Sequence, residues 1–301
     1  MNRRLALGLV LLSALCALAL AGGRVAPHER GYSKSIHVES EGGRDVVYTA
    51  PEPPGRHFVL GSDVWGFDVY SEMLHGLGWT LCIVFATATT RCAIAFAAGL
   101  ALGSSGRAGL IRRGFTPLAA MPSFILAAFV LFPLTINSGL PPAALFLLQS
   151  AVIAAVELPP LAASFAARTA SIVAMPFVDA ARVGGAGRAW ILARHVLPFA
   201  AIDLIEALPL QALSVASMVG KLGVVRIFVG GTTMTYDPLI FLPAKGEWLG
   251  LLGYYYPDVA GHPWLFLAPF CGWLLVLACV RLLASGARIA YAEARRIESL
   301  R

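Results

Sequence analysis

Four ionisable residues lie within otherwise apolar stretches of the chain, and their chemistry depends on what surrounds them there. They are Arg91, Glu157, Asp203 and Glu206. A charged group in an apolar, membrane-spanning segment is costly, so it normally faces the interior of a helix bundle or a water-filled path. Two interpretations follow: a buried ion pair that fixes helix packing, or a polar lining of a solute path. Asp203 and Glu206 are three residues apart and so share one helix face.

Patterns for catalysis or nucleotide binding are lacking in the sequence. A phosphate loop needs Gly-x-x-x-x-Gly-Lys-Ser/Thr, and Gly220-Lys221 has neither the upstream glycine nor the following hydroxyl residue. No set of nucleophile, base and orienting acid is visible. We therefore expect no catalytic residue, no bound cofactor and no metal ligand in this chain, and any ATP must be handled by another subunit.

The composition places these charges in a membrane. The chain has 301 residues, of which 58% are hydrophobic and 13% charged, and its mean hydropathy is +0.74. These values are typical of a polytopic membrane protein. A spanning helix needs about 20 apolar residues, which predicts an all-α fold with about six transmembrane helices. The expected spans are Leu5–Leu20, Trp79–Gly103, Pro117–Ile136, Ala143–Ala163, Phe199–Val219 and Trp264–Ala284.

The distribution of basic residues predicts the orientation of these spans. Segment 23–78 carries five basic and eight acidic residues, whereas the two termini and the 104–115 and 167–198 loops carry thirteen basic residues against three acids. Because basic residues accumulate on the cytoplasmic side, both termini are expected in the cytoplasm of a bacterial cell, with segment 23–76 outside its inner (plasma) membrane. The net charge of +6 then reflects topology and does not indicate nucleic-acid binding.

The first span has two interpretations. Asn2-Arg3-Arg4, an apolar run and Ala19-Leu20-Ala21 also describe a signal peptide with a small-residue cleavage site. Cleavage would leave five spans with the new N-terminus outside, and the later loops would keep their sides. We expect the segment to be retained, which divides the chain into a first transmembrane helix at 1–22, an external segment at 23–76 and a transmembrane domain at 77–301.

The external segments offer few further signals. Val46-Val47-Tyr48 predicts a short strand. The aromatic cluster Trp248, Tyr254, Tyr255 and Tyr256 in the second external region, 220–262, fits a belt at the membrane interface. The five external histidines are scattered along the sequence, which favours exposed polar residues over a metal site. They are His28, His37, His57, His75 and His262.

The positions of proline and glycine in the cytoplasmic loop 167–198 predict two short helices. Pro176 suits a first helical turn, and Asp179 in that turn is favoured by the helix dipole. Gly184 and Gly185 can adopt left-handed backbone angles and end the helix. A second helix is expected from Gly187 or Arg188 to Val196, with Pro198 opening the next span.

This loop resembles the EAA loop of ABC importer permeases. The family pattern is Glu-Ala-Ala, three residues, Gly, nine residues, then Ile-x-Leu-Pro. It appears here as Asp179-Ala180-Ala181, Gly185 and His195-Val196-Leu197-Pro198, with every spacing kept. Asp replaces Glu and His replaces Ile. In the family, this loop docks the permease onto its ATPase.

Two further features resemble the C-type membrane subunit of the oligopeptide, dipeptide and nickel transport family. Arg194-His195-Val196-Leu197-Pro198 is similar to that subfamily's Arg-His-Ile-Leu-Pro. The family also shows Gly-Thr-Asp-x-x-Gly-Arg-Asp-x-x-Ser before its second span. Here, after His57, the chain reads Gly61-Ser62-Asp63-Val64-Trp65-Gly66-Phe67-Asp68-Val69-Tyr70-Ser71.

The resemblance implies a type I ABC importer permease that forms the path for peptides or related small solutes. It implies a homologous permease, two cytoplasmic ATPases and an external solute-binding protein as partners, with ATP and Mg²⁺ held by the ATPases. Phe67 and Gly78 stand where the family usually has arginine, and the family's Ser-Phe-Leu-Gly-Leu-Gly stretch is not recognisable in Val219–Gly231. These departures lie outside the membrane or near the solute path, so they leave the identity of the substrate open.

A second hypothesis from another class is a stand-alone secondary transporter or a membrane sensor without an ATPase. Arg91 and the acidic residues would then form a proton or ion relay. Inverted repeats would support that hypothesis, and the sequence shows none.

Overall fold

Long helices dominate the computed structural model, which describes residues 3–41, 44–109 and 121–298. Five helical stretches are long and apolar enough to cross a membrane, by length and composition. They are α1 (Arg3–Val25), α2 (Val69–Ser104), α5 (Pro142–Val173), the stretch Arg188–Val224 that ends in α8 (Leu197–Val224), and α10 (Pro263–Glu298). The prediction of a multi-pass helical protein is confirmed.

The third expected span differs from the others. Within Pro117–Ile136 the structure has α4 (Ser123–Thr135), whose 13 residues are fewer than the number that normally crosses a bilayer. Residues 117–120 lie outside the described residues, as do Arg112 and Arg113 of the preceding loop. Among the described residues, five spans rather than six therefore meet the length that the prediction assumed.

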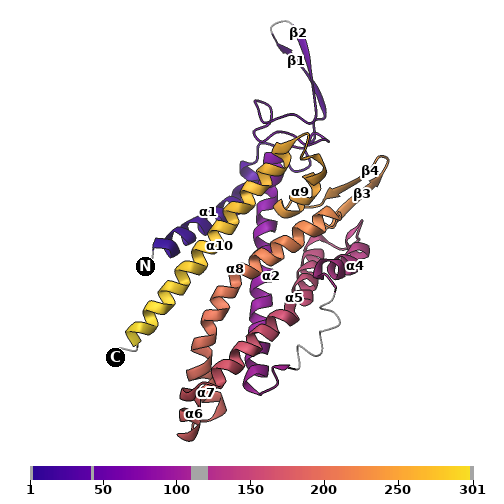
Figure 1. The fold of residues 1–301 in the computed structure, drawn as a ribbon. Helices are drawn as coiled ribbons and strands as arrows, with labels where there is room; N and C mark the ends of the chain where they lie inside the picture. Colours follow the sequence, from indigo (N-terminus) through magenta and orange to yellow (C-terminus); the bar gives the residue numbers. More distant parts are fainter. Residues whose placement is uncertain (1–2, 42–43, 110–120, 299–301) are drawn as a thin grey trace.

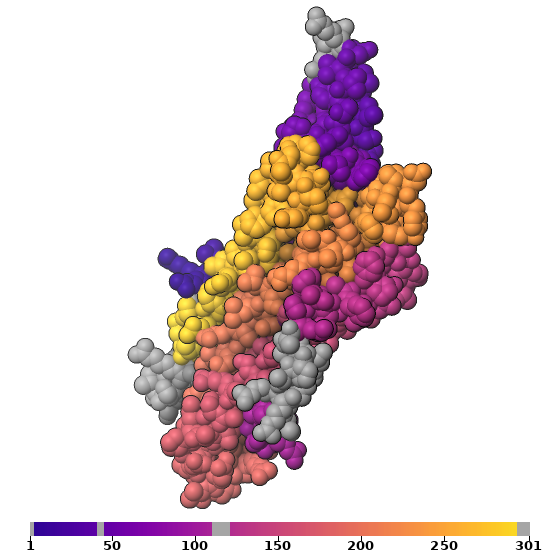
Figure 2. Space-filling model, turned by 45° about the vertical axis from the view of Figure 1, so that its right-hand side comes forward, coloured from indigo at the N-terminus to yellow at the C-terminus, as the bar shows by residue number. Residues whose placement is uncertain are grey.

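The helices form an elongated bundle with different structures at its two ends (Figure 1). Helix α2 runs through the middle and packs against α1, α5 and α8. Helices α1 and α10 lie side by side, and both termini point away from the end that carries the hairpin of β1 (Ile36–Glu41) and β2 (Arg44–Thr49). The short helix α6 (Pro176–Val183) lies at the opposite end of the molecule from that hairpin. Figure 2 shows the hairpin end as a narrow projection from the bundle.

Two β-hairpins interrupt the expected all-α pattern. Strands β1 (Ile36–Glu41) and β2 (Arg44–Thr49) pair antiparallel and include the strand predicted at Val46–Tyr48. Strands β3 (Thr232–Tyr236) and β4 (Leu239–Pro243) form a second hairpin that the sequence analysis missed. Its signal was the Asp-Pro turn between two short runs rich in threonine and large apolar residues, a composition that favours strands.

The prediction of an interfacial aromatic belt is wrong for three of its four residues. Trp248, Tyr254 and Tyr255 belong to α9 (Trp248–Tyr255) and are buried, whereas Tyr256 is exposed. The reason is that α9 packs against α8 and α10. The indole N–H of Trp248 donates to the carbonyl of Met73 at 2.7 Å, so its polar atom is satisfied inside the protein.

The histidines of the segment before α2 are not all exposed and scattered, as the sequence analysis expected. His37 is 7% exposed, and its ring and that of His57 both lie beside the carboxylate of Glu52. Residues far apart in sequence meet here because the pairing of β1 with β2 sets His37 opposite Tyr48, next to the segment that follows β2.

The second family-like motif forms the turn that starts α2. Gly61 and Gly66 adopt positive φ angles of 81° and 83°, which a side chain disfavours. Between them, the buried carboxylate of Asp63 accepts hydrogen bonds from the backbone N–H groups of Trp65 and Phe67, each at 2.9 Å. Burial raises the pKa of the Asp63 carboxyl to about 7.

Asp68 then caps α2. Its side chain accepts from the N–H of Tyr70 at 3.2 Å and from the hydroxyl of Ser71 at 2.5 Å, and it lies 3.0 Å from Nδ1 of His28. The second aspartate and the serine of the motif therefore satisfy polar groups at the buried start of the helix that runs through the bundle.

This arrangement predicts the effect of Asp68→Ala. Loss of the cap should lower the free energy of unfolding by about 1 kcal/mol, within the 0.5–2 kcal/mol range for such caps. Hydrogen exchange of the first turn of α2 should accelerate in the purified protein. Asp68→Asn is the matched control, because asparagine also caps well. Equal loss of protection in both variants would show that the cap is not the source of the stability.

Candidate functional site

A buried arginine lies at the centre of the bundle. Arg91, on α2, has no exposed surface. One terminal nitrogen, Nη1, donates to Oε2 of Glu157 at 2.5 Å and to Oε1 of Gln211 at 2.8 Å. The other, Nη2, donates to the backbone carbonyl of Ile153 at 3.3 Å. A buried charge is tolerated when it is both paired and hydrogen-bonded, and Arg91 meets both conditions.

Glu157 extends this network to further helices. Its Oε1 accepts from the hydroxyl of Ser123 on α4 at 3.1 Å, and its Oε2 accepts from the hydroxyl of Ser214 on α8. The side chain of Glu157 remains 22% exposed. Four helices, α2, α4, α5 and α8, thus contribute polar groups to one ion pair. The network constrains how these helices rotate against each other. Glu157 is its partly solvent-accessible member.

The other two intramembrane acids take different partners. Asp203 lies 3.0 Å from Nε of Arg168, and Glu206 lies 2.9 Å from Nε of Arg288. Both arginine side chains are more than half exposed. The structure thus brings Arg91 and Glu157 together and keeps Asp203 and Glu206 in two separate, more exposed pairs.

The loop expected to dock a partner begins with α6. Pro176 occupies its first turn, and Asp179 lies 2.8 Å from Nη1 of Arg182 on the exposed surface. The helix ends in a Schellman motif: the N–H of Gly185 donates to the carbonyl of Arg182, and that of Ala186 to the carbonyl of Ala181, both at 3.1 Å. Gly185 has φ of +81°. Gly184 has φ of −71°, so only the second glycine uses the left-handed conformation.

The two alanines of the EAA-like sequence point in different directions. Ala181 packs, together with fully buried Val178, against the apolar cluster beneath the loop. Ala180 is exposed, and the side chain of Val183 is 90% exposed. The sequence analysis treated both alanines as docking positions. The structure leaves Ala180 and Val183 on the outer face and gives Ala181 an internal packing role.

The chain does not break at Pro198, where the sequence analysis placed the boundary between two helices. Helix α7 (Arg188–Ile191) continues through a π-helical turn at Leu192–Val196 directly into α8. Proline lacks the N–H that an α-helix would need at this position. In the wider turn, the N–H of Leu197 donates to the carbonyl of Leu192, so the helix continues without a break.

Aromatic rings hold the two parts of the loop together. The ring of His195 lies 5.0 Å from that of Trp190 and 6.0 Å from that of Phe177 on α6, between centroids. The hydroxyl of Tyr291 on α10 donates to the carbonyl of Pro198 at 2.5 Å. Of the remaining motif residues, Arg194 and Leu197 are exposed. These contacts brace the loop against the bundle, while most of its residues from Asp179 to Trp190 remain exposed.

A cavity lies at the opposite end of the molecule. Its volume is about 390 Å³, and its lining includes Arg30, Asp63, Glu72, Tyr254 and Tyr255. Cationic, acidic and aromatic side chains thus share one space. The sequence did not reveal it, because the lining comes from segments that are distant along the chain.

The known proteins that this chain resembles in sequence are peptide transport permeases. No profile of a protein family matches the sequence. The chain is 27% identical to the di/tripeptide transport system permease protein DppC of Pseudomonas aeruginosa, over 93% of this chain and 85% of that protein. It is 30% identical to putative peptide transport system permease proteins of Brucella suis and Brucella abortus, over 49% of this chain and 47% of each relative.

The helical architecture and these similarities define a multi-pass membrane protein of the permease type. More particularly, the chain is a homologue of peptide transport system permeases. The resemblance to permeases of the oligopeptide, dipeptide and nickel transport family, first seen in the loop and in the motif before α2, is thereby confirmed.

The Arg91 network predicts a selective rescue. Arg91→Leu leaves the carboxylate of Glu157 without its cationic partner, and breaking a buried pair from one side costs about 3–5 kcal/mol. Folded yield after detergent extraction should fall, and Arg91→Leu with Glu157→Gln should recover part of it. Arg168→Leu is the control, because an exposed pair contributes only about 0–1 kcal/mol. Fluorescence-detected size-exclusion chromatography measures the yield, and rescue by Asp203→Asn in place of Glu157→Gln would contradict the assignment.

Proposed function

We propose that this chain is a permease subunit of an ATP-driven ABC importer and that it forms part of the path for peptides or related small solutes. The assembly would contain a homologous permease, two cytoplasmic ATPases and an external solute-binding protein. ATP and Mg²⁺ would be held by the ATPases, in keeping with the missing phosphate loop. The observation that carries the proposal is a braced EAA-like helix in a chain similar to peptide permeases.

Helix α6 has the properties that a coupling helix needs. It is short, lies at one end of the molecule, and presents Ala180 and Val183 outward while Val178 anchors it to the bundle. A small residue and an exposed apolar residue allow close approach of a partner surface. Because α5 precedes this loop and α8 follows it, a displacement of α6 acts on two membrane helices at once.

The cavity at the other end supports a peptide substrate. A peptide in solution carries an ammonium and a carboxylate, and the cavity lining offers the carboxylate of Glu72 and the guanidinium of Arg30. Tyr254 and Tyr255 add apolar area for side chains. We assign this cavity to the outer, solute-receiving side of the permease.

The coupling role is tested by paired glycine variants. Gly185→Val forces a β-branched residue into a left-handed conformation, whereas Gly187→Val changes a residue with an ordinary φ of −69°. Gly185→Val should abolish co-purification of the ATPases or uncouple ATP hydrolysis from uptake, and Gly187→Val should retain both. Val183→Asp, at a fully solvated side chain, should impair docking without affecting the fold.

These measurements use reconstituted vesicles with the partner subunits and a labelled dipeptide. Wild-type ATPase binding and uptake in both Gly185→Val and Val183→Asp would remove α6 as the coupling element and, with it, the main support for the importer.

The orientation has its own test. With both termini cytoplasmic, hairpin β1–β2 is external and the loop around Arg188 is internal. In a variant without native cysteines, a cysteine at Glu41 should react with an impermeant maleimide in intact cells, and a cysteine at Arg188 should react only after permeabilisation. The reverse pattern would invert the topology.

A further inference from the structure

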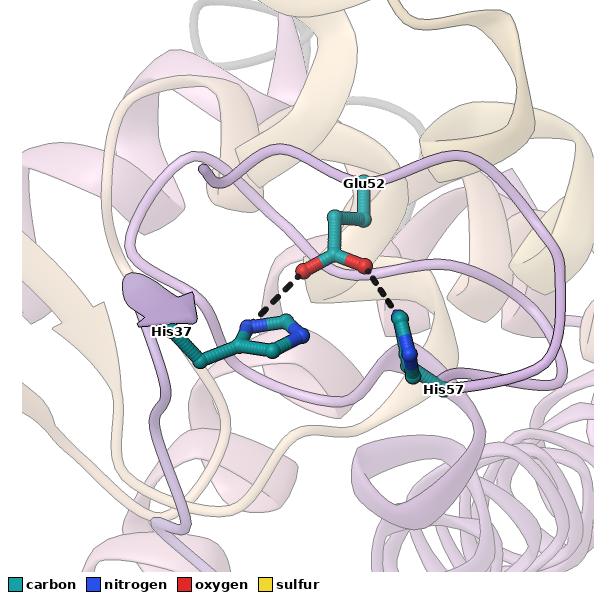
Figure 3. A group of neighbouring side chains, drawn as sticks. All are labelled: His37, Glu52 and His57. Atoms are coloured by element: carbon teal, nitrogen blue, oxygen red, sulfur yellow. Dashed lines mark hydrogen bonds and ion pairs between the residues drawn. The ribbon is translucent and has the colours of Figure 1, made fainter. Parts of the chain in front are cut away.

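Three side chains from the segment between α1 and α2 converge on one point (Figure 3). His37 lies on β1, Glu52 follows β2, and His57 is five residues further along the chain. Nδ1 of His37 is 3.3 Å from Oε1 of Glu52, and Nδ1 of His57 is 3.0 Å from Oε2. One potential ligand atom from each of the three residues lies within 4.8 Å of the other two.

Hydrogen bonding accounts for only part of this cluster: Nδ1 of His57 is hydrogen-bonded to Oε2 of Glu52. The side chains of His37 and Glu52 are only 5% and 10% exposed. Within the described part of the chain, both ring nitrogens of His37 and Oε1 of Glu52 are buried without a hydrogen-bond partner. Leaving a buried polar atom without a hydrogen bond is unfavourable. Nδ1 of His37 and Oε1 of Glu52 face each other at 3.3 Å only as an ion pair, and a cation bound between them would satisfy both atoms.

The surroundings hold the two rings in place. Tyr48, the cross-strand partner of His37, stacks on its ring at 5.1 Å between centroids and meets the ring of His57 edge-on at 4.7 Å. Nε2 of His57 lies 3.2 Å from Oε2 of Glu39. A histidine that binds a metal through one nitrogen commonly donates its other N–H to a carboxylate, and Glu39 lies where it could be that carboxylate for His57.

The donor set selects the class of ion. Two imidazoles and one carboxylate suit Zn²⁺ and similar divalent transition metals, whereas Mg²⁺ and Ca²⁺ prefer oxygen ligands throughout. Zinc lies about 2.0–2.2 Å from such donors, which places tetrahedral ligand atoms roughly 3.4 Å apart. The distances from the two histidine nitrogens to Glu52, 3.3 Å to Oε1 and 3.0 Å to Oε2, are close to that spacing and fit a carboxylate that uses both oxygens.

We propose that His37, Glu52 and His57 bind a divalent transition-metal ion of the zinc class, with Glu39 orienting His57. The ion joins hairpin β1–β2 to the loop that leads through Asp63 into α2. Its role is to stabilise this small β-containing segment, and solute transport by the bundle is a separate property.

The direct test is titration of the full-length chain in detergent with ZnCl₂, after EDTA treatment and without a histidine tag. Wild-type protein should bind one equivalent saturably, and Zn²⁺ should raise the thermal midpoint where Mg²⁺ does not. His37→Ala and His57→Ala should each weaken binding by more than 100-fold. Glu39→Gln should weaken it by about 10- to 100-fold, as expected for a residue that orients a ligand. His262→Ala, at a histidine outside the cluster, is the control and should leave affinity unchanged.

X-ray absorption at the zinc edge provides a readout that does not depend on stability. Two imidazoles and no sulfur should surround the ion, which separates this site from adventitious binding by the five free cysteines. Circular dichroism establishes that the variants remain helical, and His57→Gln replaces His57→Ala if the latter does not fold.

Three outcomes would overturn the proposal. One is the lack of saturable Zn²⁺ binding, and another is binding that His37→Ala and His57→Ala leave intact. The third is a change in pH-dependent stability in these variants without any Zn²⁺ binding, because it would identify the cluster as a proton-linked hydrogen-bond network instead.

Discussion

A single guanidinium determines how the central helices meet. Arg91 is fully buried on α2, where an unpaired charge would not be tolerated, so the groups around it must be supplied by neighbouring helices. Glu157 on α5 and Gln211 on α8 supply them, and Ile153 adds a backbone carbonyl. A contact between apolar surfaces would permit sliding and rotation, whereas these directional bonds permit few alternatives.

The position of this network links the two ends of the molecule. Helix α2 carries Arg91 and begins at the Asp68 cap, below the hairpin segment. Helices α5 and α8 carry the partners of Arg91, and these same helices flank the loop that contains α6. In the proposed importer, a movement of α6 would reach the network through both flanking helices, and α2 would carry it toward the opposite end. Alternating access by such a mechanism needs one element that acts on several spans.

Local chemistry explains how much of this could be predicted from the sequence. The end of α6 was predictable because glycine in a left-handed conformation is a local property, and Gly185 has that conformation. The pairing of Arg91 was not, because three carboxylates were available and only packing decides among them. Whether the helix continues through Pro198 depends on a π-helical turn that accommodates the missing N–H. The burial of Trp248 depends on where α9 packs. For Arg91 and Trp248 the deciding partner is distant in sequence, so periodicity and spacing carry no information about it; the π-helical turn at Pro198 is local but has no sequence signature.

Distance along the chain also explains why the sequence did not indicate that His37 and His57 lie together. His37 and His57 are separated by a strand, a turn and a loop, and only the antiparallel register that sets His37 opposite Tyr48 brings them together. A two-stranded hairpin is only marginally stable on its own, and segment 26–68 has little apolar core to support it, since Val38 and Val47 are exposed. Small structures of this kind usually depend on a cross-link or a metal ion. The His37–Glu52–His57 cluster lies where such a link would act, between the hairpin and the turn that starts α2. The contacts that stabilise the projecting segment therefore lie next to those that position the central helix.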